Sequence, residues 1–288
     1  MAQIELQPAL QAAIQAAKKA APILQHYAAH RKDLVIDFKQ HNDLVSKADK
    51  ETEQAIIRTL NKLTPDYGII AEESGGEAKG PAFWVIDPLD GTTNFLHGLP
   101  FYAISIALVA QANTIFDNQS LPHTTPVVGV IYDPNRNEFF TACHGQGAWL
   151  DQTRIYCNQT NKLKQALLST GFPFRDFNFA DQYIPMMVQA MRETRGIRRI
   201  GAAALDLAWV ACGRFDGYWE MGLAPWDVAA GTVIAREAGA LCKDIYHQET
   251  WPASGDIYCA PAALANAMHQ QFIAPHLTVR QGPTPSWL

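Results

Sequence analysis

The stretch "WVIDPLDGTTNF", residues 84–95, joins an apolar run to a pair of acids. The run 84–86 predicts a buried β-strand, and Asp87 and Asp90 follow it with Pro88 between them. Two carboxylates this close repel each other, so a positive partner is expected beside them. Asp-Pro and Asp-Gly are also common turn pairs, and the string "DPLDG" alone favours a turn and a site equally.

The segments on either side predict two kinds of structure. Helical periodicity predicts helices over residues 8–29 and 49–63. The β-rich segments that follow predict a mostly antiparallel sheet packed on these helices, with strands at 67–73, 82–87, 102–110, 126–133 and 137–142. Beyond about residue 165, strands alternate with helices and predict an α/β arrangement, with strands at 166–170, 196–200, 216–222 and 240–245 and helices at 181–194, 202–213 and 226–239. We therefore expect one catalytic unit, residues 1–288, with an N-terminal α+β half (about 1–165) and a C-terminal α/β half (about 166–275).

The composition predicts a cytoplasmic globular protein. The 288 residues are 48% hydrophobic and 18% charged, which allows a sizeable core, and the net charge of −5 argues against direct nucleic-acid binding. The five cysteines are scattered without a C-x-x-C pair, as expected of reduced thiols. The N-terminus resembles an amphipathic helix and not a signal peptide, and no run approaches the roughly 18 apolar residues of a membrane span.

Other chemistries lack part of the pattern that they require. "GQGAWL" (145–150) lacks the third glycine of a dinucleotide loop, so a turn is favoured there. His26 and His30 lie four residues apart without the Glu of a zinc helix, no G-x-S-x-G elbow occurs, and counting from Asp87 does not give a calcium loop. Phosphatases of the haloacid dehalogenase type place D-x-D after such a strand. The D-x-x-D here, with Pro88 inside, moves the second carboxylate to a different face.

Three further acids stand at the ends of apolar segments. Glu72, in "AEES" (71–74), stands with Glu73 at the end of a β-rich run, Glu220 ends the strand in "YWEMG", and Asp227 begins the helix in "PWDVAAG". Each alone has a plain explanation: Asp227 as a helix cap and Glu220 as a solvated side chain. Together with Asp87 and Asp90 they form an oxygen-rich set without Cys or His, which suits Mg²⁺. The "GTTN" after Asp90 offers N–H groups at a helix start for a phosphate, so the set predicts phosphoryl chemistry with a water nucleophile.

The segments "WVIDPLDGTTNF", "AEES" and "PWDVAAG" resemble the signature segments of the inositol monophosphatase family. The stretch 201–222 is similar to the one that precedes the last of them, and 39–51 is similar to the family's N-terminal "D-x-V-T-x-x-D" loop. The resemblance extends over about residues 8–273. It implies a layered αβαβα sandwich of the sugar phosphatase type, a Mg²⁺-dependent, lithium-sensitive phosphatase and a homodimer.

The same resemblance implies particular roles for individual residues. One Mg²⁺ would be held by Glu72, Asp87 and the Leu89 carbonyl, a second by Asp87, Asp90 and Asp227, and a third, weaker ion would lie near Glu72. Glu72 and Thr92 would orient the attacking water, with Asp49 as a further catalytic residue. Substrate would be bound by Asp90, Gly91, Thr92, Gly201, Ala203, Glu220 and Asp227. Asp49 and Lys39 would belong to a mobile loop over the metals.

The sequence departs from the family pattern at Ala202, where many members carry Ser or Thr. The loss of that hydroxyl leaves the contacts to the substrate ring open. The "EAGALCKDIYHQE" stretch likewise replaces the family's Gly-rich turn. None of the implied metal ligands is altered.

The leading function is hydrolysis of inositol monophosphate or a similar polyol phosphate by in-line attack of a water that the metal activates. The same chemistry on fructose 1,6-bisphosphate, NADP, histidinol phosphate or an adenosine bisphosphate remains open. An alternative of another class is a transcription antitermination factor that binds RNA polymerase and Nus proteins. The segment "GIRRIG" (196–201) resembles the one near the subunit interface of such members, although a strand flanked by surface arginines is favoured there.

Overall fold

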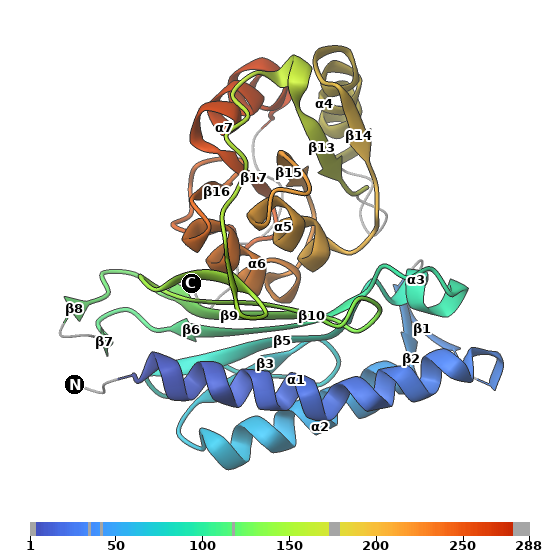
Figure 1. Ribbon diagram of the computed structural model, residues 1–288, viewed down its shortest axis with the longest axis vertical. Coiled ribbons are helices and arrows are strands. Elements are labelled where there is room, and N and C mark those ends of the chain that lie inside the picture. Colours follow the sequence, from blue (N-terminus) through green and yellow to red (C-terminus); the bar gives the residue numbers. More distant parts are fainter. Residues whose placement is uncertain (1–3, 34–35, 41–42, 117–118, 173–178, 279–288) are drawn as a thin grey trace.

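The computed structural model describes residues 4–33, 36–40, 43–116, 119–172 and 179–278. Its helices and strands form five layers (Figure 1). Helices α1 (Leu6–Ala29) and α2 (Lys47–Leu63) cover one face of an eight-stranded sheet, and α5 (Ala203–Ala211) and α6 (Pro225–Glu237) cover the other. A five-stranded sheet packs on α5 and α6, and its outer face carries α4 (Ala180–Glu193) and α7 (Ala262–Met268). The predicted αβαβα sandwich is therefore confirmed.

The eight-stranded sheet has the order β12-β11-β10-β9-β6-β5-β3-β4, and all neighbours are antiparallel except β3 and β5. Its strands are β3 (Gly68–Ala71), β4 (Gly75–Glu77), β5 (Ala82–Asp90), β6 (Ala103–Ala110), β9 (Thr125–Asp133), β10 (Glu138–Cys143), β11 (Gly147–Leu150) and β12 (Thr153–Ile155). The mostly antiparallel sheet predicted for this part of the chain is confirmed.

The five-stranded sheet has the order β14-β13-β15-β17-β16. Its strands are β13 (Leu167–Thr170), β14 (Gly196–Arg198), β15 (Gly217–Glu220), β16 (Ala240–Asp244) and β17 (Ile257–Pro261). Strand β13 runs parallel to β14 and β15, whereas β17 runs antiparallel to β15 and β16. Two small antiparallel pairs complete the strands: β1 (Ile36–Gln40) with β2 (Asp43–Ser46), and β7 (Ile115–Phe116) with β8 (Gln119–Ser120).

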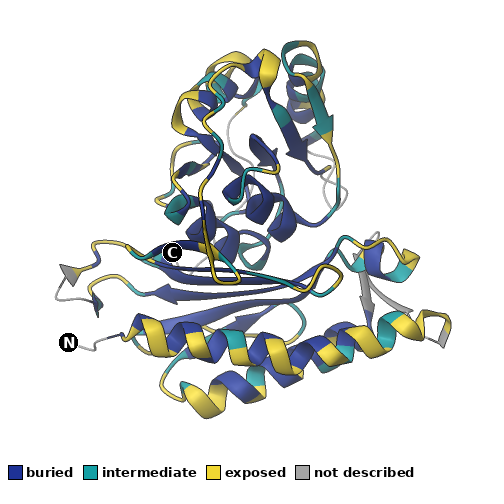
Figure 2. Cartoon of the chain, viewed as in Figure 1, coloured by how far each residue is buried: buried dark blue, intermediate teal, exposed yellow. Residues whose placement is uncertain are grey.

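Strand β5 is buried on both faces, between the helix layers on either side of the large sheet. Trp84 and Ile86 pack toward α1 and α2, while Phe83 and Val85 pack toward α5 and α6, as the alternation of strand side chains requires. Figure 2 shows the central strands buried, with exposed residues along the outer side of α1. None of the described helices is long and apolar enough to cross a membrane.

Some short elements were not predicted from the sequence. Strands β4 and β12 have three residues each, too few to show a period of their own, and α7 and β17 were also not predicted. Helix α3 (Thr92–His97) begins at the helix start predicted after Asp90.

Glycine lets α6 pack closely on the large sheet at β9. A Cβ on Gly129 would lie 2.5 Å from the Ala230 carbonyl oxygen, which is backbone and cannot rotate away. Gly196, at the start of β14, differs: a Cβ there would meet only side-chain atoms at 3.5 Å or more.

We expect Gly129→Ala to lower the free energy of unfolding by about 1–3 kcal/mol, because α6 must move off the sheet. Gly196→Ala should change it by less than about 0.5 kcal/mol. Urea denaturation of both variants measures the difference, and equal stabilities would contradict the close packing of α6 on β9.

Candidate active site

An irregularity at the end of β5 brings its two aspartates to one face. Asp87 pairs with Ser105 and Asp90 pairs with Ala103, so three steps along β5 match two along β6. This is a β-bulge, and Pro88 within it has no N–H to lose from the ladder. In a regular strand, residues three apart would point to opposite faces. The sequence-based expectation of different faces is therefore wrong, since the bulge turns both carboxylates toward α5 and α6.

A third carboxylate reaches the same place from the start of α6. Asp227 accepts a hydrogen bond from the Ala224 N–H at 2.7 Å, so it caps the helix as its sequence position predicts. One carboxylate oxygen from each of Asp87, Asp90 and Asp227 lies within 4.8 Å of the others. The Ser105 hydroxyl donates to the Trp226 carbonyl at 3.1 Å and ties β6 to the same turn of α6.

The three aspartates are buried, with 2%, 8% and 7% of their surfaces exposed. Burial raises the pKa of Asp87 well above its usual value, and the charges of Glu72, Asp90 and Asp227 raise it further. Burial and the charge of Asp227 likewise raise the pKa of Asp90. A buried cluster of mutually repelling acids is stabilised when a cation joins it.

This donor set fits the Mg²⁺ implied by the sequence. The cluster offers carboxylate oxygens only, and oxygen ligands in such number favour hard divalent cations. Leu89 is positioned by two neighbours. Its N–H donates to Asp87 Oδ1 at 2.9 Å, and its carbonyl accepts from the Thr92 hydroxyl at 3.0 Å.

Glu72 stands in the turn after β3, beside the cluster. Its N–H donates to the Ile86 carbonyl at 3.1 Å, which fixes the turn next to β5. Glu53 of α2 stabilises the same turn, since its carboxylate accepts hydrogen bonds from the N–H groups of Glu73 and Ser74 at 2.8 and 2.9 Å. The buried Glu53 was not identified from the sequence, where it looked like one more acid on an amphipathic helix.

Asp49 lies in the first turn of α2 and is 1% exposed, so the expectation that it belongs to a loop is wrong. It caps this helix by accepting from the N–H and hydroxyl of Ser46 at 2.8 and 2.6 Å. Its other oxygen accepts from the Thr92 hydroxyl at 3.0 Å. Burial raises the pKa of Asp49, although these hydrogen bonds oppose the shift. Lys39 lies in β1, and its side chain is outside the described part of the structure.

Gly91 and Gly201 meet where α3 approaches α5. Gly91 has a φ of +90°, and a Cβ there would lie 2.7 Å from the Phe101 carbonyl oxygen. Asn94 joins these segments, because its amide donates to the carbonyls of Phe101 and Ile200 at 2.8 Å each, a role that was not predicted from the sequence.

Asp90 supplies the cap that α5 lacks in its own sequence. Ala202 stands at the N-cap and has no side-chain acceptor, while Asp90 Oδ2 accepts from the Ala204 N–H at 2.7 Å. Ala202 and Ala203 are both buried beside this contact. The sequence predicted a helix start close to Asp90 in the chain. In the structure Asp90 also caps α5, which begins more than 100 residues later.

Glu220 ends β15 on the same side of the molecule and is 9% exposed. The Tyr218 hydroxyl donates to it at 2.6 Å, and a Cβ on Gly171 would overlap its carboxylate. The charge of Glu220 also raises the pKa of Asp90, which places the two acids near each other. Neither Tyr218 nor Gly171 showed a signal in the sequence that would mark it.

Asp206, in the first turn of α5, is another residue whose role was not predicted from the sequence. It is 1% exposed, and its Oδ1 has no hydrogen-bond partner among the described residues. Burial raises its pKa well above the usual range, and the charges of Glu220 and Asp90 add to the shift, while the Ser169 hydroxyl and the charge of Arg199 oppose it. Asp216 is a matched contrast: its carboxylate accepts from Asn158, Thr160 and the Leu167 N–H at 2.7–2.8 Å.

Comparison with known proteins gives consistent results. A model of the inositol monophosphatase family matches residues 5–278. A Nus factor SuhB from Pasteurella multocida is 42% identical over 88% of this chain and 92% of its own length. The Escherichia coli K12 protein named Nus factor SuhB is 40% identical over 91% and 95%.

Solved structures resemble the chain over nearly its whole length. The extragenic suppressor protein suhB from Bartonella henselae has a TM-score of 0.83 at 35% identity, over 92% of this chain and 98% of that one. An inositol monophosphatase from Anabaena has a TM-score of 0.79 at 34% identity, over 93% and 96%.

The raised pKa of Asp206 should make the stability of the protein depend on pH in a measurable direction. The folded state binds its proton more tightly than the unfolded state does, so the carboxyl lowers the free energy of unfolding as pH rises from about 4. We expect Asp206→Asn to leave stability unchanged or higher at pH 8 and to flatten this decline.

Asp216→Asn is the control, and it should lose about 1–3 kcal/mol because an amide nitrogen would face hydrogen-bond donors. Urea denaturation of both variants between pH 5 and 8 measures the contrast. A large loss in Asp206→Asn at pH 8 would show that its carboxylate is charged and partnered.

Proposed function

Because the chain belongs to the inositol monophosphatase family, we propose that it is a Mg²⁺-dependent phosphomonoesterase acting on inositol monophosphate or a similar polyol phosphate. Membership of the family supports phosphatase chemistry. The observation that carries the proposal is the buried cluster of Asp87, Asp90 and Asp227, which is unfavourable without a cation. The family is Mg²⁺-dependent in general, and the oxygen-only cluster suits that ion.

The ligands proposed for one ion are Glu72, Asp87 and the Leu89 carbonyl. Those for a second are Asp87, Asp90 and Asp227, and a third, weaker ion is proposed near Glu72. When bound, such ions lower the pKa of a coordinated water and neutralise charge on the phosphoryl and leaving oxygens. The bulge at Pro88 is what allows Asp87 and Asp90 to face one site together.

The residues around the ions are proposed to position the reactants. The Thr92 hydroxyl lies between Asp49 Oδ1 and the Leu89 carbonyl and donates its one proton to them. Its oxygen lone pairs are then directed to accept from a water, so Asp49 fixes the orientation in which Thr92 and Glu72 hold the nucleophile. The N–H groups of Gly91 and Thr92 are proposed to bind the phosphate.

The alcohol part of the substrate is proposed to be bound by Gly201, Ala203 and Glu220, and by the carboxylates of Asp90 and Asp227. Glu220, fixed by Tyr218, accepts hydrogen bonds from hydroxyl groups. Its negative charge disfavours a second phosphate nearby, which supports a monophosphate of a polyol over fructose 1,6-bisphosphate, NADP or an adenosine bisphosphate. Histidinol phosphate carries an amine that Glu220 would tolerate, so it stays the strongest alternative.

We also propose that the chain is a single catalytic unit, because β5 and α6 each contribute acids to the cluster. The proposal includes a homodimer in the cytoplasm, as the resemblance to the family implies.

Asp87→Asn should reduce Mg²⁺-dependent phosphate release by roughly 100-fold or more, because it removes the ligand common to both proposed ions. Its thermal stability without Mg²⁺ should be equal or higher, since a buried repelling charge is gone. Asp151→Asn, a turn residue outside the cluster, is the control and should keep full activity. Near-normal turnover in Asp87→Asn would refute the metal assignment.

The substrate is tested by phosphate release from inositol 1-phosphate, histidinol phosphate, fructose 1,6-bisphosphate, NADP and 3′-phosphoadenosine 5′-phosphate. We expect inositol 1-phosphate to be fastest, only with Mg²⁺, and lithium to inhibit at high Mg²⁺. Faster turnover of another ester keeps the chemistry and changes the substrate. No release from any of them would refute the phosphatase proposal.

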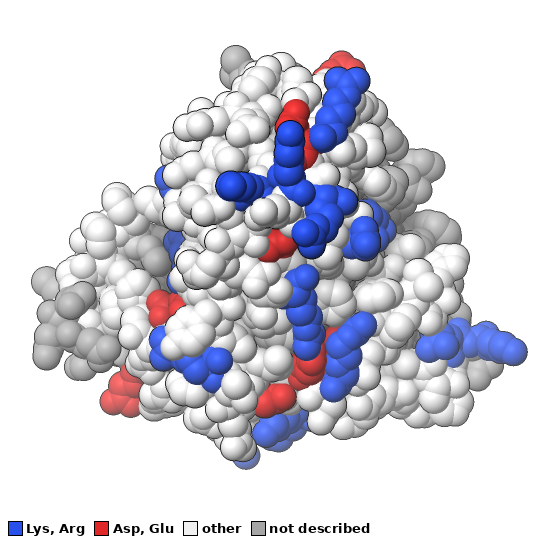
Figure 3. Space-filling model, turned by 45° about the horizontal axis from the view of Figure 1, so that its top comes forward, with Lys and Arg blue, Asp and Glu red and all other residues white. Residues whose placement is uncertain are grey.

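A second function is supported by relatives at 40–42% identity whose printed name is Nus factor SuhB. We propose that this chain associates with RNA polymerase and Nus proteins. Lys and Arg side chains gather on one face of the molecule (Figure 3). Within 192–199, Arg192, Arg195, Arg198 and Arg199 are exposed and suit an acidic protein surface.

A pull-down with purified RNA polymerase and Nus factors from the native host tests this association. We expect capture by the native chain and weaker capture by Arg198→Ala, with phosphate release unchanged in that variant. Absence of capture at low and physiological salt would contradict the association.

A further inference from the structure

Two cysteines face each other in the five-stranded sheet, away from the acidic cluster. Cys242 of β16 is the direct partner of Cys259 of β17 in an antiparallel pair without register shifts. They are 2% and 0% exposed, and both are free thiols. In the sequence, 16 residues lie between these two cysteines, so their pairing becomes visible only from the register of the two strands.

Pro261 shows which type of antiparallel position the cysteines occupy. It pairs with Ala240, and because proline has no N–H this pair is of the non-hydrogen-bonded type. Pair types alternate along the ladder, so Leu241 with Ala260 is hydrogen-bonded and Cys242 with Cys259 is again non-hydrogen-bonded. Such positions have Cα atoms about 4.5 Å apart, within the 4.4–6.8 Å that a disulfide spans.

The two thiols differ in acidity. Burial raises the pKa of the Cys242 thiol, but the neighbouring Cys259 thiol, the charge of Arg236 and the Thr232 hydroxyl outweigh burial and leave the pKa below its usual value. The neighbouring Cys242 sulfur and burial raise the pKa of Cys259. Cys242 therefore has the greater thiolate character, and Cys259, its direct partner across the ladder, is positioned as a resolving thiol.

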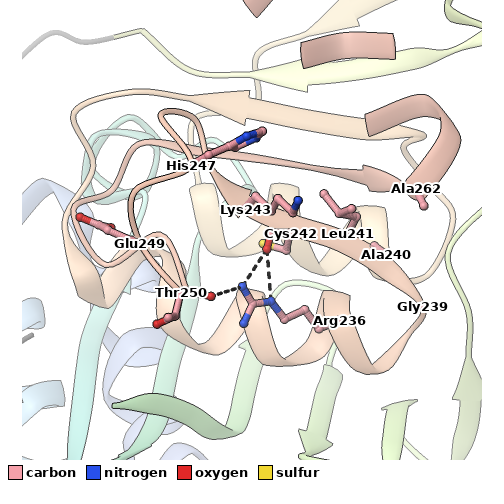
Figure 4. A pocket seen from close by; sticks show the side chains of 10 residues that line it. All are labelled: Arg236, Gly239, Ala240, Leu241, Cys242, Lys243, His247, Glu249, Thr250 and Ala262. Atoms are coloured by element: carbon pink, nitrogen blue, oxygen red, sulfur yellow. Dashed lines mark hydrogen bonds between the residues drawn. The ribbon is translucent and has the colours of Figure 1, made fainter. Parts of the chain in front are cut away.

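A pocket lies beside Cys242. Cys242 lines a pocket of about 500 Å³ together with Arg236, Lys243 and His247 (Figure 4). Arg236 Nη2 donates to the carbonyls of Cys242 and Thr250 at 2.8 and 2.9 Å and holds its positive charge beside β16. Strand β16 is the edge of its sheet, so local opening of one strand exposes the thiol.

We propose that Cys242 and Cys259 form a reversible cross-strand disulfide when the protein meets a peroxide. The Cys242 sulfur attacks one peroxide oxygen, the O–O bond breaks, and hydroxide leaves and takes up the thiol proton as water. The resulting sulfenic acid is attacked by the Cys259 sulfur, the S–O bond breaks, and a second water leaves. One hydrogen peroxide is reduced to two waters while two thiols are oxidised to one disulfide.

The disulfide would change a contact between β16 and α6. The Cys242 thiol donates to the Thr232 hydroxyl at 3.6 Å, and Thr232 lies in the helix that begins beside Asp227. Oxidation removes that S–H and links the edge strand β16 covalently to β17. This inference does not depend on the proposed phosphatase activity.

The test is treatment of the full-length chain with hydrogen peroxide, followed by trapping of free thiols in denaturant. We expect the five thiols to fall to three, a mass lower by two hydrogens, a cross-linked peptide pair containing Cys242 and Cys259, and full reversal by dithiothreitol. Cys242→Ala and Cys259→Ala should each abolish the cross-link.

Cys143→Ala is the matched control, because Cys143 is also buried but its pKa is raised to about 12, and this variant should cross-link normally. A link between Cys157 and Cys259 would overturn the assignment. So would five remaining thiols, or oxidation of Cys242 to a sulfinic acid without a cross-link, at peroxide concentrations that oxidise free cysteine.

Discussion

The mutual repulsion of Asp87, Asp90 and Asp227 is the constraint on which the rest of the structure depends. Three buried carboxylates are held within 4.8 Å by elements that come from different layers. In a dry interior such an arrangement is costly, so each acid has a backbone donor beside it: Leu89, Ala204 and Ala224 respectively. The backbone fixes the acids in place, and the charge that remains is available to a cation.

Helix ends do much of this positioning. Asp227 and Asp49 cap α6 and α2, the helices to which they belong, whereas Asp90 caps α5 from strand β5 of the eight-stranded sheet. The same carboxylates thus have a structural and a proposed catalytic use, since a helix N-terminus attracts the negative charge that a metal site needs. Replacing one of them therefore changes local helix stability as well as the site.

The sequence was informative where periodicity or position has a direct physical meaning. Apolar runs located β5, β6 and β9, and acids at the ends of such runs pointed to the cluster. The bulge at Pro88 was not visible, because it depends on how many residues β6 offers opposite β5. Glu53, Asn94 and Asp206 were also missed, because each interacts with a residue that is distant in the sequence: Glu73, Ile200 and Asp90 respectively. The periodicity of residues 49–63 placed Asp49 at a helix start, which the structure confirms, whereas the loop implied by the family resemblance is wrong.

The contact from Asp90 to the Ala204 N–H joins residues 114 positions apart, and this has a consequence for how the chain folds. Helix α5 has no acceptor of its own at its N-cap, so its first turn gains a partner only after the large sheet has formed and the chain has closed a long loop. Non-local contacts of this kind slow folding. The acidic cluster likewise joins residues 87, 90 and 227, so a newly made chain cannot complete its cation site before the start of α6 has been synthesised.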